Sequence, residues 1–199
     1  MAPSRLTNAS PEETLVAYYR LLRTHGLNDA HSGNVSLSDG ARIWITPTGA
    51  CADLLEPEDI LSFALAENPP PGASLDAPLH HGVYRRNPEA RAVFHAHGVY
   101  ALALSLVVPR IRPLDFEGAY YFGEVPILDV PYADYVRLAP GRVAETLRDH
   151  PLCLVRGHGL YAWGRTPDQA YKWLSSFESS ARLVALARLL GSTPGEEAS

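Results

Sequence analysis

The stretch Ala92-Val93-Phe94-His95-Ala96-His97-Gly98 predicts a short buried strand that ends in two histidines. Side chains two positions apart in a strand point to the same face, so His95 and His97 present two imidazoles side by side. The apolar residues 99–106 predict a helix, which places the pair at the carboxyl end of a strand, where α/β proteins usually carry their chemistry. Two neutral imidazoles supply half of a tetrahedral zinc site, although an isolated His-x-His pair is equally consistent with two histidines that only hydrogen-bond to neighbours.

A third histidine, His158, lies between two glycines shortly after the apolar run 152–155. The glycines let the backbone adopt unusual torsions and let a ligand approach closely. Three imidazole nitrogens with an open fourth position are the composition of a catalytic zinc site rather than a structural one. The pattern favours a site made of His95, His97 and His158, and the alternative is that His158 is only a turn residue.

The composition excludes several classes of protein. The chain has 199 residues, of which 46% are hydrophobic and 20% charged, and its net charge of −5 includes no basic segment. This predicts one domain, 1–199, with no nucleic-acid partner, although a small anionic ligand remains compatible. Cys51 and Cys153 are far apart in the sequence, which argues against a disulfide framework and favours a cytoplasmic location. No signal-peptide pattern and no apolar run near ~18 residues is present, so no membrane partner is expected.

The order of helical and strand-like segments predicts an α/β fold. Ser10 with Glu13, and Thr166 with Gln169, form capping boxes that start the first and the last predicted helix, and Asp39-Gly40 marks a hairpin turn. Because a hairpin requires antiparallel strands, a mixed or antiparallel sheet with helices on its faces fits better than a parallel sheet. The predicted helices span 11–25, 76–86, 99–106, 141–149 and 167–190, and the predicted strands span 35–37, 42–46, 60–66, 92–97, 125–130, 152–155 and 160–163. Residues 111–122 are expected to be irregular, and 1–9 and 192–199 to be loose tails.

Three short loops have the composition of an anion site: Gly33-Asn34, Thr48-Gly49, and Ser74 just before a helix. Backbone N–H groups, hydroxyls and helix N-termini bind phosphate, although ordinary turns look the same. Asp76 follows at the helix start, where it could be a metal ligand or a base, but its spacing alone favours a carboxylate that interacts with the helix dipole. The histidines outside the proposed site are assigned to a helix end, an exposed helix face and a loop: His25, His80, His81 and His150.

Five motifs, in this order and spacing, resemble the class II aldolase/adducin family, in particular its L-fuculose-1-phosphate aldolases. The resemblance covers roughly residues 15–190. The motifs are Ser32-Gly33-Asn34-Val35-Ser36, Ile45-Thr46-Pro47-Thr48-Gly49, Ser74-Leu75-Asp76-Ala77-Pro78-Leu79-His80, Val93-Phe94-His95-Ala96-His97 and Arg156-Gly157-His158-Gly159. The resemblance implies a three-layer α/β/α sandwich with a central mixed, mainly antiparallel sheet, and a homotetramer with sites near the subunit interfaces.

The resemblance also implies a site and a reaction. His95, His97 and His158 would bind a divalent metal, normally Zn2+ with Mn2+ or Co2+ as alternatives, and the phosphate of a sugar phosphate would bind to Gly33, Asn34, Thr48, Gly49 and Ser74. The implied reaction cleaves a ketose 1-phosphate to dihydroxyacetone phosphate and an aldehyde through a metal-stabilised enediolate. Asp76 would be the base or a metal ligand. The accessory acid would be Glu117, Tyr120 or Tyr121.

Departures from the family pattern keep other reactions open. The aldolases carry Glu where this chain has Asp76, and a shift of about 1 Å can cost on the order of 10²-fold in rate. The related epimerases carry Asp there, but Tyr120 replaces their further acidic residue. Ser74-Leu75 replaces the double serine of the aldolases, and Glu117 falls near the acid/base of the related dehydratases. An epimerase, dehydratase or decarboxylase on the same metal site is therefore an alternative. A non-catalytic adducin-like scaffold is a weaker one, because all three histidines are present.

Overall fold

The computed structural model describes residues 8–191, so the predicted loose tails lie outside the described residues except for positions 8, 9 and 191. The helices are α1 (Pro11–Thr24), α2 (Ala77–Arg86), α3 (Val99–Val107), α4 (Phe116–Phe122), α5 (Tyr135–Asp149) and α6 (Pro167–Leu189), with 3-10 turns η1 (Pro57–Asp59) and η2 (Tyr132–Asp134). The strands are β1 (Asn34–Ser38), β2 (Arg42–Ile45), β3 (Leu61–Ala64), β4 (Ala92–Ala96), β5 (Ile127–Leu128), β6 (Leu152–Val155) and β7 (Gly159–Gly164).

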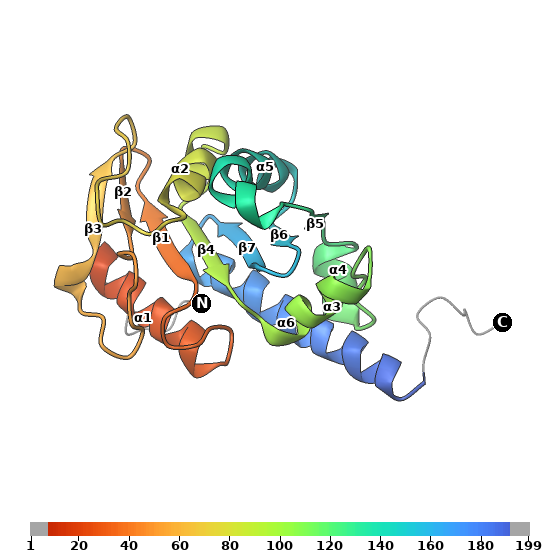
Figure 1. The fold of residues 1–199 in the computed structure, drawn as a ribbon. Coiled ribbons are helices and arrows are strands. Elements are labelled where there is room, and N and C mark those ends of the chain that lie inside the picture. Colours follow the sequence, from red (N-terminus) through yellow and green to blue (C-terminus); the bar gives the residue numbers. More distant parts are fainter. Residues whose placement is uncertain (1–7, 192–199) are drawn as a thin grey trace.

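The strands described in residues 8–191 form one seven-stranded sheet in the order β3-β2-β1-β4-β7-β6-β5 (Figure 1). Every neighbouring pair is antiparallel except β5 and β6, which are parallel. The hairpin between β1 and β2 turns at the predicted position, where the Asp39 carboxylate accepts hydrogen bonds from the backbone N–H groups of Ala41 and Arg42. The mixed, mainly antiparallel sheet is therefore confirmed.

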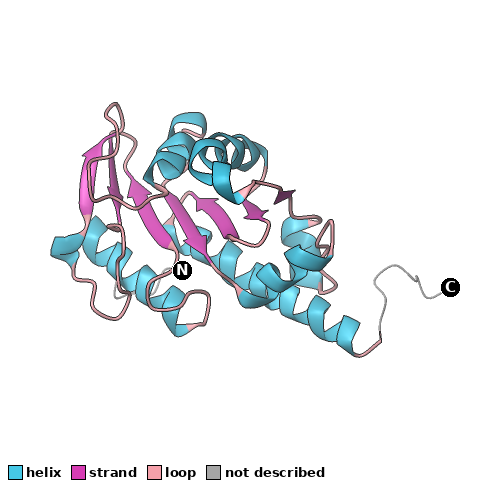
Figure 2. Ribbon diagram, in the orientation of Figure 1, coloured by secondary structure: helices cyan, strands magenta, loops and turns pink. Residues whose placement is uncertain are grey.

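Helices cover both faces of the sheet, which gives the predicted α/β/α sandwich (Figure 2). One face of β4 carries Phe94, which packs into a core with α1, α3 and α6. The opposite face carries Val93, which packs into a second core with α2 and α5. Since side chains alternate along a strand, His95 lies on the same face as Val93, toward α2 and α5.

The N-terminal half of α5 and the whole of α4 were not predicted. A helix was expected from residue 141, but α5 begins at Tyr135 and contains Pro140, because Ala139, Val143 and Leu147 bury its face against the second core. Residues 111–122 were expected to be irregular, but residues 116–122 form α4. The Asp115 side chain accepts a hydrogen bond from the Gly118 backbone N–H, which is an N-cap that the sequence already contained.

Three smaller expectations also require correction. The strand expected over 125–130 is reduced to Ile127–Leu128. His80 and His81 are buried rather than exposed, because α2 is enclosed between the sheet and α5 and so buries more than one face. The capping box at Ser10 is complete, whereas the Gln169 side chain at the start of α6 accepts from the Arg165 N–H instead of from the N-cap Thr166. No helix among the described residues is long and apolar enough to span a membrane.

Candidate active site

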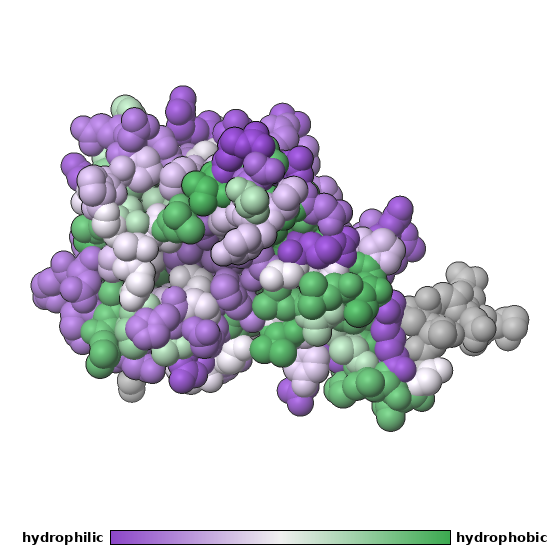
Figure 3. Space-filling model, in the orientation of Figure 1, coloured by the Kyte–Doolittle hydropathy of each residue, from purple (hydrophilic) through white to green (hydrophobic). Residues whose placement is uncertain are grey.

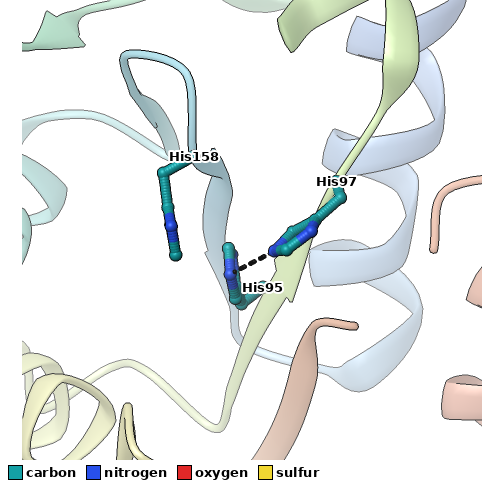
Figure 4. Close-up of side chains that lie close together, drawn as sticks. All are labelled: His95, His97 and His158. Carbon is teal, nitrogen blue, oxygen red and sulfur yellow. Dashed lines mark hydrogen bonds between the residues drawn. The ribbon is translucent and has the colours of Figure 1, made fainter. Parts of the chain in front are cut away.

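His95, His97 and His158 meet at the carboxyl end of β4 (Figure 4). His95 is the fourth residue of β4, His97 follows the strand directly, and His158 lies in the tight turn between β6 and β7. One ring nitrogen of each histidine lies within 4.8 Å of the others, and the Nε2 atoms of His95 and His97 are 2.9 Å apart. Segments about 60 positions apart in the chain thus form one cluster, in which His95 and His97 lie side by side as the strand alternation predicted.

His95 and His158 each have a ring nitrogen that is available to a metal. His95 Nδ1 lies 2.9 Å from the Leu160 carbonyl oxygen, and because a carbonyl can only accept, this nitrogen carries the proton. The lone pair of His95 is therefore on Nε2, which faces His97. His158 Nε2 is buried and has no hydrogen-bond partner among the described residues. A hydrogen bond from the second ring nitrogen to a carbonyl and an unpartnered buried imidazole nitrogen both fit the ligands of a divalent metal.

The protonation state of the cluster suits metal binding as well. Burial lowers the pKa of His95 well below its usual value and also lowers the pKa of His97 and of His158. Repulsion from the His158 imidazole lowers the pKa of His97 further. The three rings are neutral at pH 7, and neutral imidazole is the form that binds a metal.

Asp76 places a carboxylate beside the histidines. It is buried at the N-terminus of α2, and its Oδ2 lies 3.7 Å from His95 Nε2. Asn34 Nδ2 donates to it over 3.0 Å, the Tyr135 hydroxyl over 2.7 Å and the Tyr161 hydroxyl over 3.0 Å. In the described part of the chain the side chain makes no capping bond to α2, so an interaction with the helix dipole does not describe its contacts.

Asp76 is ionised at neutral pH. Burial by itself would raise its pKa, but the neighbouring His95 and the hydrogen bonds from Asn34 and Tyr135 lower the pKa to about 2. A buried ionised carboxylate costs free energy unless it has partners, and a cationic metal at the histidines would be a partner in addition to these donors. Asp76 therefore has the charge and the position of a base or a metal ligand.

The three anion loops line the same pocket as the histidines, which has a volume of about 220 Å³. An isolated bridge between Pro47 and Ala73 holds the second and third loops side by side. The Ser74 hydroxyl accepts from the backbone N–H of Asp76 and so lies at the N-terminus of α2. The predicted residues in this pocket are Gly33, Asn34, Thr48, Gly49, Ser74, Asp76, His95, His97 and His158.

Two glycines are required for this arrangement. Gly33 has φ +70°, and a Cβ there would lie 2.5 Å from the His95 carbonyl oxygen. A Cβ at Gly159 would lie 2.5 Å from His95 Cε1 and 2.9 Å from His97 Cδ2. The backbone at these two positions therefore approaches His95 and His97 as closely as only glycine allows.

Comparison with known proteins identifies a family and several relatives of this chain. The family model of the Class II Aldolase and Adducin N-terminal domain matches residues 13–185. The chain belongs to this family. A methylthioribulose-1-phosphate dehydratase of Pseudomonas aeruginosa (strain UCBPP-PA14) is 36% identical over 177 residues, which cover 80% of this chain and 85% of the relative. An L-fuculose phosphate aldolase of Methanocaldococcus jannaschii is 29% identical over 161 residues, covering 79% of this chain and 86% of the relative.

The fold is that of a class II aldolase. The crystal structure of an L-fuculose-1-phosphate aldolase from Thermus thermophilus matches with a TM-score of 0.82 and 38% identity, over 91% of this chain and 96% of that one. The relatives of this chain therefore include proteins named for two different reactions, a dehydration and an aldol cleavage. Family membership supports an enzyme of this superfamily, and the residues of the site determine which of these reactions the chain can catalyse.

The accessory residues predicted from the class II aldolase resemblance do not line this pocket. Glu117, Tyr120 and Tyr121 lie on α4, which packs against α6. Tyr120 is 86% exposed, and the Tyr121 ring contacts Trp173 at 5.5 Å between ring centroids. Within one chain, then, the structure separates these three residues from the histidines.

Two tyrosines that the sequence did not single out take a place in the site instead. Tyr161 pairs with His95 across β4 and β7, and the two rings stack with centroids 4.0 Å apart. Tyr135, the first residue of α5, lines the pocket and contacts His158 with centroids 4.4 Å apart. The spacing His158-x-x-Tyr161 was visible, but only the strand register shows that Tyr161 lies beside His95.

Proposed function

We propose that this protein is a zinc-dependent aldehyde-lyase that cleaves a ketose 1-phosphate to dihydroxyacetone phosphate and an aldehyde. The observation that supports this most directly is one pocket that combines three neutral imidazoles, a buried ionised carboxylate and three loops suited to phosphate. A retro-aldol reaction needs those three functions: a cation to stabilise negative charge on substrate oxygens, a base, and an anchor for the phosphate.

In this proposal His95, His97 and His158 hold the zinc ion, with Mn2+ or Co2+ as alternatives. When bound, the metal supplies Lewis-acid stabilisation of the negative charge that develops on the substrate. Gly33, Asn34, Thr48, Gly49 and Ser74 bind the phosphate through backbone N–H groups and side-chain donors.

Asp76 accepts the proton in the proposed reaction. Its carboxylate is ionised, and the Tyr135 and Tyr161 hydroxyls and the Asn34 amide restrict its orientation. These donors hold the Asp76 carboxylate beside His95, so the group that accepts the proton stays next to the proposed metal ligands. Asp76 is shorter than the Glu that the aldolases carry at this position, and the hydroxyls of Tyr135 and Tyr161 hold its carboxylate in place.

A dehydratase is the second candidate, and a specific observation favours it: the 36% identical relatives are named as methylthioribulose-1-phosphate dehydratases. The two candidates share the metal site and differ in the bond that breaks, carbon–carbon in the aldolase and carbon–oxygen in the dehydratase. In the dehydratase, Glu117 would be the acid/base.

For Glu117, Tyr120 or Tyr121 to act, a neighbouring subunit must bring α4 to the pocket. We propose that the chain forms a cytoplasmic homotetramer in which α4 lies at a subunit contact. Apolar side chains gather over α3, α4 and the C-terminal end of α6 (Figure 3). Phe116 on α4 is 93% exposed, which is unusual for a large aromatic side chain unless it is covered by a partner.

Product analysis separates the candidates. The zinc-loaded protein is incubated separately with L-fuculose 1-phosphate and with 5-methylthioribulose 1-phosphate, and the products are identified by NMR and mass spectrometry. Dihydroxyacetone phosphate together with an aldehyde supports the aldolase, whereas a phosphorylated product that has lost one water supports the dehydratase. Protein that binds no metal and turns over neither compound would contradict both, and the adducin-like scaffold would then be the better description.

A further inference from the structure

Glu178 contacts the start of the helix that follows His97, and the proposed reaction does not use it. It belongs to α6, which lies beside α3 (Figure 1). Its Oε1 accepts a hydrogen bond of 2.8 Å from the backbone N–H of Tyr100, and its Oε2 accepts one of 3.0 Å from that of Ala101. The carboxylate therefore binds two of the N–H groups that the first turn of a helix leaves without partners.

The segment between β4 and α3 depends on contacts from other parts of the chain. His97 lies just beyond β4, and only Gly98 separates it from α3. Gly98 is the N-cap residue of α3 and has no side chain that could cap it. The backbone N–H of His97 is held by the Leu27 carbonyl oxygen at 2.8 Å and by Asn28 Oδ1 at 3.0 Å. Glu178 thus fixes the chain on the other side of His97, where α3 begins.

The glycine at position 98 is explained by this carboxylate rather than by its own backbone. Gly98 has φ −52°, a value that other residues adopt as well. A Cβ there would overlap Glu178 Oε2 and would lie 2.7 Å from Glu178 Cδ. Because these atoms are the end of a flexible side chain, an alanine at position 98 would displace the carboxylate from α3.

The surroundings of Glu178 show that it is not half of an ion pair. The side chain is half-buried, and burial raises its pKa, although the hydrogen bonds from Tyr100 and Ala101 oppose this rise. Arg182, one turn further along α6, lies over the Tyr100 ring, 5.6 Å from its centroid. In the described part of the chain, the hydrogen-bond partners of the Glu178 carboxylate are the two N–H groups of α3. Its interactions therefore act on the placement of that helix.

We propose that Glu178 is a positioning residue of the metal site, which fixes His97 by holding the start of α3 from α6. This inference rests on the metal site of the proposed function, and it adds to that site a residue that does not line the metal pocket. It applies to the aldolase and to the dehydratase alike, because both use the same three histidines.

The test compares metal binding in variants that remove the carboxylate. Glu178→Ala should lower the zinc affinity roughly 10-fold, as the loss of an outer neighbour of a metal ligand typically does, and Glu178→Gln, which keeps one accepting oxygen, should lower it less. With Co2+ as the probe, the visible absorption bands of Glu178→Ala should differ from those of the wild type, since these bands report the geometry of the ligands.

Leu104→Ala is the matched control. It removes a buried side chain from the core that α3 shares with α6, at the other end of α3 from His97. It should therefore lower the stability of the protein, because it leaves a cavity, but keep the zinc affinity and the Co2+ spectrum of the wild type.

A double-mutant cycle with Gly98→Ala relates the effect to the carboxylate. In the wild-type background Gly98→Ala should lower the zinc affinity, because it displaces the Glu178 carboxylate. In the Glu178→Ala background the same substitution should change the affinity by no more than about 2-fold, because no carboxylate remains to be displaced. Gly98→Ala keeps the Glu178 side chain, so it also tests the inference if Glu178→Ala does not fold.

Two results would overturn the inference. Unchanged zinc affinity and an unchanged Co2+ spectrum in Gly98→Ala and in Glu178→Ala would show that the carboxylate only joins α3 to α6. Equal effects of Gly98→Ala in the two backgrounds would show that the alanine acts independently of Glu178. Wild-type protein that binds zinc but turns over no sugar phosphate would reject the proposed function and not this inference, whereas wild-type protein that binds no metal would reject both.

Discussion

The carboxyl end of β4 and helix α4 both carry residues with the chemistry of an active site, but these residues differ in how far they are buried. At β4, His95 and Asp76 are buried. His95 donates to the Leu160 carbonyl oxygen, and the Asp76 carboxylate accepts from side chains of β1, α5 and β7. On α4, Tyr120 and Phe116 project away from their own chain. Burying ionisable groups costs free energy unless they are paired, so the first region is an assembled site.

The second region is an exposed surface, which the proposed tetramer would cover with a neighbouring subunit. Phe116 and Tyr120 are exposed within an apolar area. Exposed apolar surface of this kind does not stabilise a monomer. The difference shows that residue type alone did not distinguish a residue of the pocket from a residue of a contact surface. Variants in the two regions should therefore differ in their effect on zinc binding: substitutions at β4 should reduce it, and substitutions on α4 should not.

The largest expected effect is that of His97→Ala. Removal of one of three imidazoles should reduce zinc affinity by more than about 100-fold, since even indirect neighbours of a metal cost ~10–100-fold when altered. Zinc content after purification, measured by elemental analysis, should fall from about one ion per chain to near zero, and turnover should fall with it. His150→Ala, at an exposed position after α5, is the control that should retain the metal. Full zinc occupancy in His97→Ala would contradict the three-histidine site.

Asp76→Asn should affect the reaction more than the metal. The amide keeps the shape of the side chain but cannot accept a proton, so we expect turnover to fall by roughly 10²–10⁴-fold, the usual contribution of a general base. Steady-state kinetics and zinc content are measured on the same sample. Asp53→Asn, an exposed position next to Arg23, should be indistinguishable from wild type. If turnover and metal content are both intact in Asp76→Asn, the role assigned to Asp76 is wrong.

Gly159→Ala should weaken the metal site through the backbone. A Cβ at 2.5 Å from the His95 ring must displace that ring, and we expect zinc affinity to fall by about 10–100-fold. A competitive zinc titration is performed on protein that unfolds cooperatively. Gly141→Ala is the matched control, because a Cβ there meets no atom within 4 Å. Equal zinc affinities of the two variants would show that the close approach of β7 does not position the histidines.

Phe116→Asp should change assembly without changing the metal. Because Phe116 is exposed in the chain itself, the free energy of unfolding of a monomer should shift by no more than about 0.5 kcal/mol. Sedimentation should show a smaller particle, with reduced turnover and unchanged zinc per chain. Leu54→Asp, at an apolar side chain before η1 that is 75% exposed, should keep the wild-type mass. An unchanged mass for Phe116→Asp would remove the argument that α4 reaches a neighbouring pocket.

The smallest expected effect on activity is that of His80→Gln, which instead tests stability in acid. Burial lowers the pKa of His80 from 6.5 to about 4, although Asp76 partly opposes this. Between these pH values the unfolded chain binds more protons than the folded one, so stability is full above pH 6.5 and is lost as the pH falls toward 4. His80→Gln should lessen this loss by about 3 kcal/mol, measured by urea unfolding across that range. His150→Gln should lose as much stability as wild type, and an identical loss in His80→Gln would contradict the prediction.

Much of the candidate site could be read from the sequence because its signals are local. The alternation of a strand alone places His95 and His97 together, and Gly33, Thr48 and Ser74 lie in loops whose composition is itself the signal. Asp76 was visible, but its role was not. Its partners Tyr135 and Tyr161 are 59 and 85 positions away, and no periodicity connects residues at such distances.

The sequence by itself determined the hairpin, the alternation of helices and strands, and the placement of His95 beside His97, because each depends on neighbouring residues and on the periods of regular structure. Only the tertiary structure decided that Tyr161 lies beside His95, that α5 extends through Pro140, and that Glu117 and Tyr120 do not line the pocket of their own chain. Those outcomes depend on strand register and on packing between distant segments. At these positions the free energy gained by burial outweighs the local conformational preference of the residues. That free energy depends on the packing of the whole fold.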